Sequence, residues 1–431
     1  MEKRRDMTGI IFIAILPTIA LVLWLFSPGV SLDFKDKWDF FFFLGKAFGV
    51  VGMIMFAISM ILSAKFKFLE EFFYGLNRVY IKHSQIGQIA FMLMLFHPIL
   101  LLAEYTDLTF GGAVGFFSLG GSLAQSFGVV SLYLMIILIF LTLYMRPKYH
   151  IWKWTHKFMG FAFFFAGLHV FLIPSDTSVF LPLRIYVLLI SGFAIYAFTY
   201  HTILGFITNK KYVYVVSDLK NFDNIVEVRL SPVGSKKMDF IPGQFAFISF
   251  RDKKIGTESH PFSMSSGLND NTVSFTIKNL GDFTSNLSNL KIGTEVYLEG
   301  PFGKFSYNEA EFKKQIWIAG GIGITPFLSM AKSIPRDNGF SVDLYYCVRD
   351  EKEAVYLKEL SSLENPSLNI IPFYSNTEGF INANVIDKKS NGIKDKSIFI
   401  CSPVAMLETL KRQFRISGIP ANLIHSEEFS L

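Results

Sequence analysis

The chain has 431 residues, of which 51% are hydrophobic and 18% charged, and its formal net charge at pH 7 is +6. The mean hydropathy of +0.39 is too high for a soluble protein, whereas the charged residues of the second half exclude a chain embedded wholly in a membrane. Only two cysteines occur, Cys347 and Cys401, which excludes a disulfide framework and suits a reducing compartment. The length allows two or three domains. The basic residues are placed as membrane topology requires, so we expect no nucleic-acid partner.

The first half contains six apolar segments that are each long enough to cross a bilayer with a hydrocarbon core of about 30 Å. The basic residues of the short connections fall mainly on one side, which the positive-inside rule assigns to the cytoplasm. We therefore predict a multi-pass protein of the plasma membrane with both termini in the cytoplasm. The first segment follows MEKRR without a clear cleavage site and is interpreted as a retained anchor. The six segments are residues 10–26, 40–63, 85–103, 127–145, 156–173 and 182–204.

Histidines occur in pairs at the third and fifth of these segments. His83 and His97 are separated by fourteen residues, and His156 and His169 by thirteen. Fourteen residues span about 21 Å along a helix axis, so two such helices side by side would hold two stacked haems, each ligated by one imidazole from each helix. Ionisable groups inside a membrane are costly and are therefore candidates for function. The alternative is a proton or ion pathway.

The two spacings are not equivalent on a regular helix. Fourteen steps of about 100° return to within about 40° of the same face, whereas thirteen miss it by about 140°. We therefore expect either a local irregularity between His156 and His169, near Gly160 or Gly167, or a haem with a different tilt.

The pattern changes at Lys210, where short β-rich pieces separated by glycine and proline replace the long apolar runs. They predict an antiparallel β-barrel over residues 211–308. From Gln315 onward, strands alternate with a glycine-rich turn and helices, which predicts a parallel, doubly wound sheet. The predicted domains are a six-helix transmembrane domain at 1–209, a barrel domain at 210–310 and an α/β domain at 311–431.

Two stretches of the predicted barrel suit a flavin nucleotide. In the first, HPFS, Phe262 offers a flat apolar wall and Ser263 a hydroxyl for the flavin N5. In the second, KNLGDFT, Lys278, the Thr284 hydroxyl and the free N–H groups of a helix start suit a pyrophosphate. The alternative for the second stretch is a helix start with Thr284 as its N-cap.

The predicted α/β domain carries three candidate nucleotide-binding positions. The turn GGIGITP, residues 320–326, follows a strand and opens a helix, where glycines and free N–H groups admit phosphate. A tight structural turn is the alternative, because GxGxxG is absent. Arg349 and the sequence Cys401-Ser402-Pro403 lie at strand ends, where open α/β sheets bind ligands. The Arg349 guanidinium suits an adenosine 2′-phosphate, and a surface arginine is the alternative.

HPFS, KNLGDFT, GGIGITP, YCVR and CSP, in this order, resemble the ferredoxin–NADP reductase type of flavoprotein. With the paired histidines, the chain from about residue 40 onward resembles a bacterial NADPH oxidase of the transmembrane ferric-reductase superfamily. The family usually has glycine where Ser402 stands. The resemblance implies FAD at His260, Pro261, Phe262, Ser263, Lys278, Gly281 and Thr284, NADPH at Gly320, Gly321, Gly323, Thr325, Pro326, Arg349, Cys401 and Pro403, and two b-type haems at His83, His97, His156 and His169.

The resemblance also implies a function, which is the transfer of electrons from cytosolic NADPH through FAD and two haems to O2 outside the cell, giving superoxide. Reduction of a ferric chelate with the same cofactors is the alternative. Ser263, Cys401 and Phe429 are the expected catalytic residues, with Phe429 as the near-terminal aromatic that stacks on the flavin, although Ser430 and Leu431 follow it. No regulatory subunit is expected.

Overall fold

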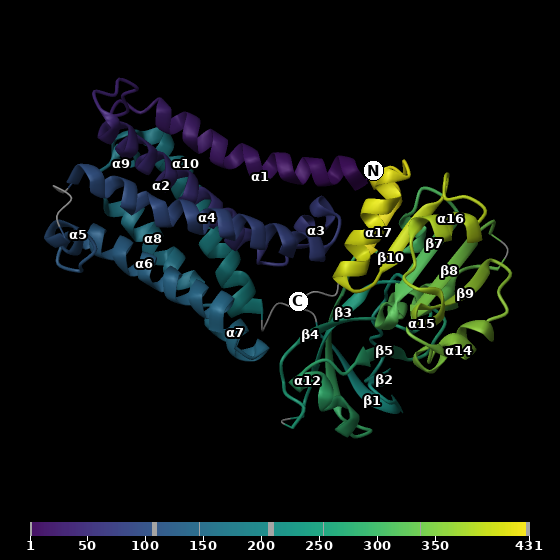
Figure 1. The fold of residues 1–431 in the computed structure, drawn as a ribbon. Helices are drawn as coiled ribbons and strands as arrows, with labels where there is room; N and C mark the ends of the chain where they lie inside the picture. The colour runs from purple at the N-terminus through teal and green to yellow at the C-terminus, as the bar shows by residue number, and fades with distance from the viewer. Residues whose placement is uncertain are drawn as a thin grey trace. The chain divides into compact units, whose positions relative to one another are not determined.

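The computed structural model describes residues 2–105, 110–145, 147–205, 211–252, 254–336 and 338–427, without the side chains of residues 2–8, 103–105, 110, 203 and 204. Its backbone contacts divide the chain into two units, Arg4–Thr208 and a second that comprises Asn209–Leu431 (Figure 1). The first unit is helical. The second contains two β-sheets and the helices that pack against them.

The first unit is a helical bundle in which α4 and α10 pack on α2, and α8 packs on α6. Within the described residues, five helical segments are long and apolar enough to cross a membrane, namely Lys37–Leu62, Leu76–Leu102, Leu123–Met145, Tyr149–Leu172 and Leu181–Thr202. The helices are α1 (Glu2–Leu25), α2 (Lys37–Leu62), α3 (Lys67–Phe73), α4 (Leu76–Tyr105), α5 (Phe110–Phe116), α6 (Leu123–Phe140), α7 (Tyr149–His156), α8 (Met159–Leu172), α9 (Asp176–Val179) and α10 (Leu181–Thr199).

Five of the six predicted spans therefore coincide with long apolar helices, and the sixth remains a prediction. The first predicted span lies in α1, whose apolar part, Gly9–Leu25, is shorter than the other five. Seventeen residues extend about 26 Å, somewhat less than the hydrocarbon core of about 30 Å.

Local sequence explains where several of these helices begin and end. The Asp36 carboxylate caps α2 by accepting from the N–H groups of Trp38 and Asp39, at 2.7 and 3.0 Å. The Ser122 hydroxyl caps α6 in the same way. Pro182 lies in the first turn of α10, where its missing N–H costs nothing. The polar caps thus set helix starts in segments that are otherwise uniformly apolar.

The first sheet of the second unit is antiparallel, with the strand order β4-β3-β6-β1-β2-β5 in the described residues. A bridge between Met264, just after β4, and Phe275 of β5 connects the two edges, so the sheet curls toward a closed barrel as predicted. Its inner face holds one apolar core that includes Leu230, Ile248 and Leu298. The strands are β1 (Lys211–Phe222), β2 (Ile225–Pro232), β3 (Phe245–Phe250), β4 (His260–Ser263), β5 (Val273–Lys278) and β6 (Glu295–Phe302), and α12 (Asp282–Ser285) follows β5.

The second sheet is parallel, as predicted, and in the part of the chain that is described its strand order is β11-β10-β7-β8-β9. The chain therefore reverses its winding direction between β7 and β10, the place where doubly wound sheets bind ligands. The strands are β7 (Lys314–Gly320), β8 (Ser341–Val348), β9 (Leu368–Tyr374), β10 (Ser397–Cys401) and β11 (Ile424–Glu427), and the helices are α13 (Ile324–Ser333), α14 (Leu357–Ser361), α15 (Ser375–Glu378), α16 (Ala383–Lys389) and α17 (Val404–Ile416).

Each face of the parallel sheet has its own apolar core, because successive side chains of a strand point to opposite faces. Trp317 of β7 lies in the core that includes Phe327 of α13. Its neighbour Ile316 lies in the other core, with Leu407 and Phe414 of α17. These two cores fix the positions at which β7, β8 and β10 end, and those ends carry the predicted nucleotide-binding residues.

Candidate functional site

The two histidine pairs lie on facing helices of the first unit. His83 and His97 belong to α4, whereas His156 ends α7 and His169 lies in the last turn of α8. The ring centres of His83 and His156 are 6.1 Å apart, with their planes at 86°. His97 and His169 lie within electrostatic range of each other. The first separation suits two imidazoles that share one metal ion, since two metal–nitrogen bonds of about 2 Å each leave ring centres roughly 6 Å apart.

A break between α7 and α8 accounts for more than half of the angular mismatch between His156 and His169. From Lys157 to Phe161, four backbone N–H groups donate to the carbonyl three residues earlier, which is the 3₁₀ pattern. Each such step turns the chain about 20° further than an α-helical step, so four steps recover about 80° of the missing ~140°. The irregularity therefore lies just before Gly160, while α8 continues through Gly167 without interruption.

Three of the four histidines direct Nδ1 at a backbone carbonyl of a neighbouring helix. The Nδ1 of His83 lies 2.8 Å from the Ser59 carbonyl oxygen, that of His97 2.7 Å from Gly45, and that of His169 2.8 Å from Ala124. Donation from Nδ1–H leaves Nε2 as the free lone pair, which is the usual arrangement of a metal-ligating histidine. The donor set fits bis-imidazole haem ligation. It does not fit a bare metal ion, since no cluster of three or more ligating side chains occurs among the described residues.

His156 is held differently from the other three. Its Nδ1 is buried and has no hydrogen-bond partner within the described part of the chain. Its ring instead stacks on that of Trp152, one turn earlier in α7, with ring centres 5.5 Å apart and planes at 26°. The His83/His156 pair thus has one hydrogen-bonded and one stacked imidazole.

The two stretches predicted to bind FAD come together at one edge of the barrel. HPFS forms the edge strand β4, where Pro261, which has no N–H, interrupts no ladder on its open side. The His260 ring stacks on Phe283 of α12 at 4.0 Å, and Phe262 lies nearly parallel to Phe283 at 6.4 Å. Phe283 belongs to KNLGDFT and was not among the predicted site residues. An aromatic in both stretches is the sequence signal that would have indicated this contact.

The polar groups of the same region occupy defined positions. Ser263 is buried, and its hydroxyl has no hydrogen-bond partner in the described residues, so the hydroxyl fits a flavin polar atom. Lys278 ends β5. Gly281 is the N-cap of α12, and the Thr284 hydroxyl accepts from the N–H groups of Leu280 and Gly281, at 2.9 and 3.0 Å. The alternative in which Thr284 is the N-cap is therefore wrong, because Thr284 lies three residues inside the helix.

GGIGITP and CSP meet where the α/β sheet reverses its winding direction. Ala319 at the end of β7 pairs with Cys401 at the end of β10. A Cβ on Gly323 would overlap the Cys401 carbonyl, and one on Gly320 would lie 2.7 Å from the Ser402 Cβ. Gly321 has a positive φ of 56°. Close approach therefore requires glycine at 320 and 323, and the positive φ favours it at 321. Both facts also support the structural-turn alternative, but the turn stands at the ligand-binding position of the fold.

Buried hydrogen bonds connect the barrel to the α/β sheet. Thr325 lies in the turn of GGIGITP, and its hydroxyl donates to Ile322 at 2.8 Å and reaches the Thr276 carbonyl of β5 at 3.5 Å. The Thr276 hydroxyl lies 3.0 Å from the Tyr356 hydroxyl, which donates to Glu227 of β2 at 3.3 Å. Two residues after Thr276, β5 ends at Lys278. The network therefore joins the turn of GGIGITP to β5 and β2 of the barrel.

The Arg349 side chain is exposed, but its guanidinium is already hydrogen-bonded to Glu353. Its Nε and Nη2 both donate to Oε1 of Glu353, the Nε at 2.6 Å, and its backbone N–H donates to Oε2 at 3.1 Å. The hydrogen bonds from the Arg349 guanidinium hold the pKa of Glu353 below its usual value. Glu353 was not predicted as a site residue, although an acidic residue four positions after the arginine is readable in the sequence. A 2′-phosphate at Arg349 must compete with this carboxylate.

Cys401 is fully buried at the end of β10, opposite Glu427 of β11. Burial, and to a lesser degree the Glu427 charge, raises the pKa of the Cys401 thiol well above its usual value. Pro403 immediately precedes α17. Phe429, the predicted aromatic over the flavin, lies outside the described residues, two positions beyond Glu427. Glu427 was not predicted either, since nothing in HSEEFSL distinguishes its burial from that of its acidic neighbour.

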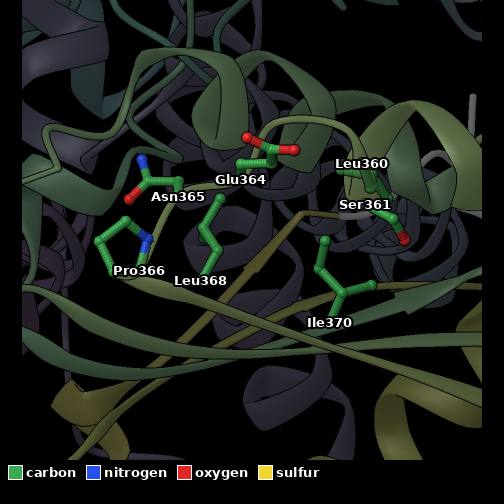
Figure 2. Close-up of a pocket in the computed structure, with 7 residues that line it drawn as sticks. All are labelled: Leu360, Ser361, Glu364, Asn365, Pro366, Leu368 and Ile370. Carbon is green, nitrogen blue, oxygen red and sulfur yellow. The ribbon is translucent and has the colours of Figure 1, made fainter.

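Two surface hollows lie outside the motifs. The first, of about 250 Å³, lies between α14 and β9 and contains none of the predicted site residues. Figure 2 shows its lining, which is Leu360, Ser361, Glu364, Asn365, Pro366, Leu368 and Ile370. The second, of about 480 Å³, is in the first unit and is lined by Gly112, Gly115, Phe116, Ser118, Gly120, Gly121 and Gln125.

Three families match the chain in succession. Residues 48–167 match the ferric reductase like transmembrane component, residues 208–306 an FAD-binding domain and residues 317–412 an oxidoreductase NAD-binding domain. The first match includes His83, His97 and His156 and ends two residues before His169. The second includes both predicted FAD stretches. The third includes GGIGITP, Arg349 and CSP.

Individual relatives match only about half of the chain. It is 26% identical over 203 residues to the ferredoxin reductase component of 3-ketosteroid-9-alpha-monooxygenase of Mycobacterium tuberculosis, covering 45% of this chain and 56% of that protein. It is 26% identical over 255 residues to flavohemoprotein A of Dictyostelium discoideum, covering 55% and 64%. Among solved structures, the ferredoxin reductase in carbazole 1,9a-dioxygenase shares 23% identity with a TM-score of 0.45, over 51% of this chain and 70% of that one.

The chain thus spans less than two thirds of the length of these two curated relatives, and the arrangement of the whole chain follows from the three family matches. A ferric-reductase-like transmembrane component precedes an FAD-binding domain of curled antiparallel sheet and an NAD-binding domain of parallel α/β structure. The chain therefore has the architecture of the ferric-reductase and ferredoxin–NADP-reductase-like flavocytochromes.

Proposed function

We propose that the chain carries electrons from cytosolic NADPH to an acceptor on the opposite side of the plasma membrane, using FAD and two b-type haems. The acceptor is O2 and the product superoxide, so the chain acts as an NADPH oxidase. Both termini are cytoplasmic in this proposal. When bound, FAD converts a two-electron hydride into single electrons, and the haems carry these across the bilayer.

The observation that carries the proposal is the pairing of imidazoles on two facing helices, three of them fixed by backbone carbonyls, in a chain that also has FAD-binding and NAD-binding domains. Each pair offers two neutral nitrogen ligands. A proton or ion pathway would have no use for the nucleotide-binding domains. His83 and His156 would hold one haem and His97 and His169 the other, about 21 Å further along α4.

The residues of the second unit have distinct roles in this proposal. Phe262 and Ser263 orient the flavin ring, and Lys278 binds the FAD pyrophosphate. The N–H groups of Leu280 and Gly281 already donate to the Thr284 hydroxyl, so these two groups would have to exchange that bond to reach a phosphate. Residues 320–326 bind the phosphates of NADPH, and Cys401 and Pro403 place its nicotinamide. Support comes from the position of the proposed NADPH-binding groups at the ends of β7 and β10 and from the buried Ser263 hydroxyl, which has no hydrogen-bond partner among the described residues.

The hollow of residues 112–125 favours O2 as the acceptor. Its lining is neutral and rich in glycine, with no charged side chain among the described residues. Gln125, which lines it, follows Ala124, whose carbonyl accepts from His169. A small uncharged molecule suits such a lining better than a charged ferric chelate, which would be expected to require ionic partners.

Reduction of a ferric chelate is the second candidate. It is favoured by the match of residues 48–167 to the ferric reductase like transmembrane component. It requires the same residues for NADPH, FAD and the haems and differs only at the outer face.

One preparation tests both candidates. The full chain is purified in detergent with haem and FAD, and NADPH consumption is measured with O2 alone and with a ferric chelate under argon. Superoxide formation that accounts for most of the NADPH consumed supports the oxidase. Rapid chelate reduction with slow O2 turnover supports the reductase. A visible spectrum without paired Soret and α bands would exclude both, since each requires haem.

A further inference from the structure

We infer that Gly49 and Gly128 are positioning residues, and that each leaves a helix carbonyl open so that the imidazole of His97 or His169 can dock on it. The inference rests on the proposed haem ligation and adds two residues that contribute no ligand atom. Both glycines lie in spanning helices other than those that carry the histidines, Gly49 in α2 and Gly128 in α6.

The first docking position is on α2. The Nδ1 of His97 lies 2.7 Å from the Gly45 carbonyl oxygen. Gly49 follows Gly45 by one helical turn, and a Cβ on Gly49 would lie 2.7 Å from both Nδ1 and Cε1 of His97. Helical side chains tilt toward the N-terminus, so a side chain at position i+4 lies over the carbonyl of residue i. Glycine at 49 therefore uncovers the carbonyl that His97 needs.

The second docking position, on α6, repeats the first. The Nδ1 of His169 lies 2.8 Å from the Ala124 carbonyl oxygen. Gly128 follows Ala124 by one turn, and a Cβ there would lie 2.8 Å from Nδ1 and 3.1 Å from Cε1 of His169. The segments are GKAFG on α2 and AQSFG on α6, with a small residue under the carbonyl and glycine one turn later. Two histidines on different helices thus meet the same local backbone arrangement.

His83 and His156 differ from His97 and His169 in how their rings are held. His83 docks on the Ser59 carbonyl at 2.8 Å, and the residue one turn later is Ser63, a small side chain whose hydroxyl is turned to Met60 at 2.7 Å. His156 has no docking carbonyl within the described residues. Both imidazoles of the His97/His169 pair are therefore fixed by backbone, whereas the other pair has one such imidazole.

The consequence for ligation follows from ring orientation. Donation from Nδ1–H to a carbonyl fixes the tautomer and aims Nε2, and loss of such a partner typically costs about 10–100-fold in metal affinity. A methyl group at residue 49 or 128 would push the ring off the carbonyl, because carbon and nitrogen atoms cannot approach to 2.7–2.8 Å without a hydrogen bond. The ring would then turn, and Nε2 with it.

The alternative explanation is that these glycines serve helix packing alone, since small residues are common where membrane helices meet. Gly52, on the same helix, provides the matched control. The three atoms nearest to a Cβ on Gly52 would belong to Met94 and Leu93 of α4, at 3.1–3.2 Å, and not to a histidine. Gly192 of α10, whose Cβ would meet nothing within 4 Å, controls for the substitution itself.

The experiment compares Gly49→Ala, Gly128→Ala, Gly52→Ala and Gly192→Ala with the wild type, using the full chain in detergent. Haem per protein, flavin per protein and the low-spin EPR signals are measured in each. We expect Gly49→Ala and Gly128→Ala to lose or shift one of two low-spin signals, with haem per protein falling from about two toward one at limiting haem. The second haem signal and the flavin content should stay at the wild-type level, as should all signals of both controls.

Unchanged haem signals in Gly49→Ala and Gly128→Ala, or an equal loss in Gly52→Ala, would overturn the inference. A wild type without haem would overturn it by removing the proposed function, which the wild-type spectrum alone reveals. If Gly49→Ala does not accumulate, Gly49→Ala/His97→Ala decides. Accumulation restored to the level of His97→Ala supports the clash with the ring, and continued failure overturns it.

Discussion

The Glu353 carboxylate holds Arg349 at three points, through the guanidinium Nε and Nη2 and through the backbone N–H. Glu353 is itself held in a turn, because the Asp350 carboxylate accepts from the N–H groups of Lys352 and Glu353 at 3.1 and 3.3 Å. The side chain proposed to recognise a 2′-phosphate is thus engaged by a fixed negative charge. The preference for NADPH over NADH therefore depends on whether the 2′-phosphate displaces the Glu353 carboxylate from Arg349.

The first prediction follows from this competition. Glu353→Gln removes the negative charge that a 2′-phosphate must displace, so the KM for NADPH should fall while that for NADH changes little. The change should stay below about tenfold, because the Arg349–Glu353 pair is exposed and solvent screens its charges. Arg349→Ala should raise the KM for NADPH and leave that for NADH. Steady-state kinetics with both nucleotides measure this.

Glu408→Gln is the control, since Glu408 forms an exposed pair with Lys411 on α17. A rise in the KM for NADPH on Glu353→Gln would show that Glu353 orients Arg349 for the phosphate. Equal changes for NADPH and NADH would place the pair in folding.

The second prediction separates the two haems by their histidines. His97→Ala and His169→Ala should each lose one haem and leave the other, with FAD still reducible by NADPH. His83→Ala should lose the other haem and stop electron transfer to the acceptor. Difference spectra of dithionite-reduced and oxidised protein measure both. If any one of these three variants keeps two haems and full turnover, the ligand assignment is wrong.

The third prediction uses the contrast between His156 and the other histidines. Because the His156 ring stacks on Trp152 and its Nδ1 has no hydrogen-bond partner in the described part of the chain, Trp152→Leu should disturb only the His83/His156 haem. The EPR signal of that haem should shift, whereas the signal lost in His97→Ala should keep its wild-type position. Trp154→Leu, on the same helix but with its ring against Phe158, is the matched control. A shift of both signals by Trp152→Leu would mean that the bundle as a whole is perturbed.

The fourth prediction concerns the flavin. Ser263→Ala should slow flavin reduction by roughly fivefold, the equivalent of one hydrogen bond of about 1 kcal/mol, without loss of bound FAD. Phe283→Leu should do the reverse, lowering FAD content because it removes the ring on which His260 stacks. Stopped-flow reduction by NADPH and the flavin-to-protein ratio distinguish the two. Identical effects of both variants on both measurements would leave Ser263 without a specific role.

The sequence predicted the kinds of structure better than their contacts. Short β-rich pieces separated by glycine and proline predicted the antiparallel barrel, and strands alternating with a glycine-rich turn and helices predicted the parallel sheet, because these are local signals. The spacing of His156 and His169 predicted an irregularity, and the structure places it at Lys157–Phe158. It directly precedes Gly160, one of the two glycines near which the sequence predicted it. The local pattern did not record that a Cβ at Gly160 would meet the Phe198 ring of α10.

Contacts between residues far apart in the chain could not be predicted either, because local sequence patterns do not record them. The bond from His97 to Gly45 joins residues 52 apart, and the bond from His169 to Ala124 joins residues 45 apart. Either end alone looks like an ordinary residue of an apolar helix. The placement of the Phe429 ring over the flavin remains a prediction from the sequence.

The last prediction is a pH dependence that arises from the two thiols. Burial raises the pKa of Cys347 to about 12, and the carboxylate of Glu378 adds to the shift. Cys401 shifts in the same direction, as described above. Both side chains are therefore neutral thiols at physiological pH, and in native protein they should react slowly with maleimide at about pH 8, whereas unfolded protein should react fully at the ordinary thiol pKa of about 8.5.

The sign for stability follows from proton binding. The folded state keeps the Cys347 proton to a higher pH than the unfolded state does, so the contribution of this thiol to stability is complete below the unfolded pKa of about 8.5–9 and is lost as pH rises from there toward 12. The Tm of the wild type should therefore fall more steeply above about pH 9 than that of Cys347→Ala, and the two curves should run parallel below about pH 8. Two results would contradict this prediction: Tm curves that run parallel across the whole pH range, or native protein that is labelled as fast and as completely as unfolded protein. Either would show that the Cys347 thiolate is accessible to water and that burial does not govern its ionisation.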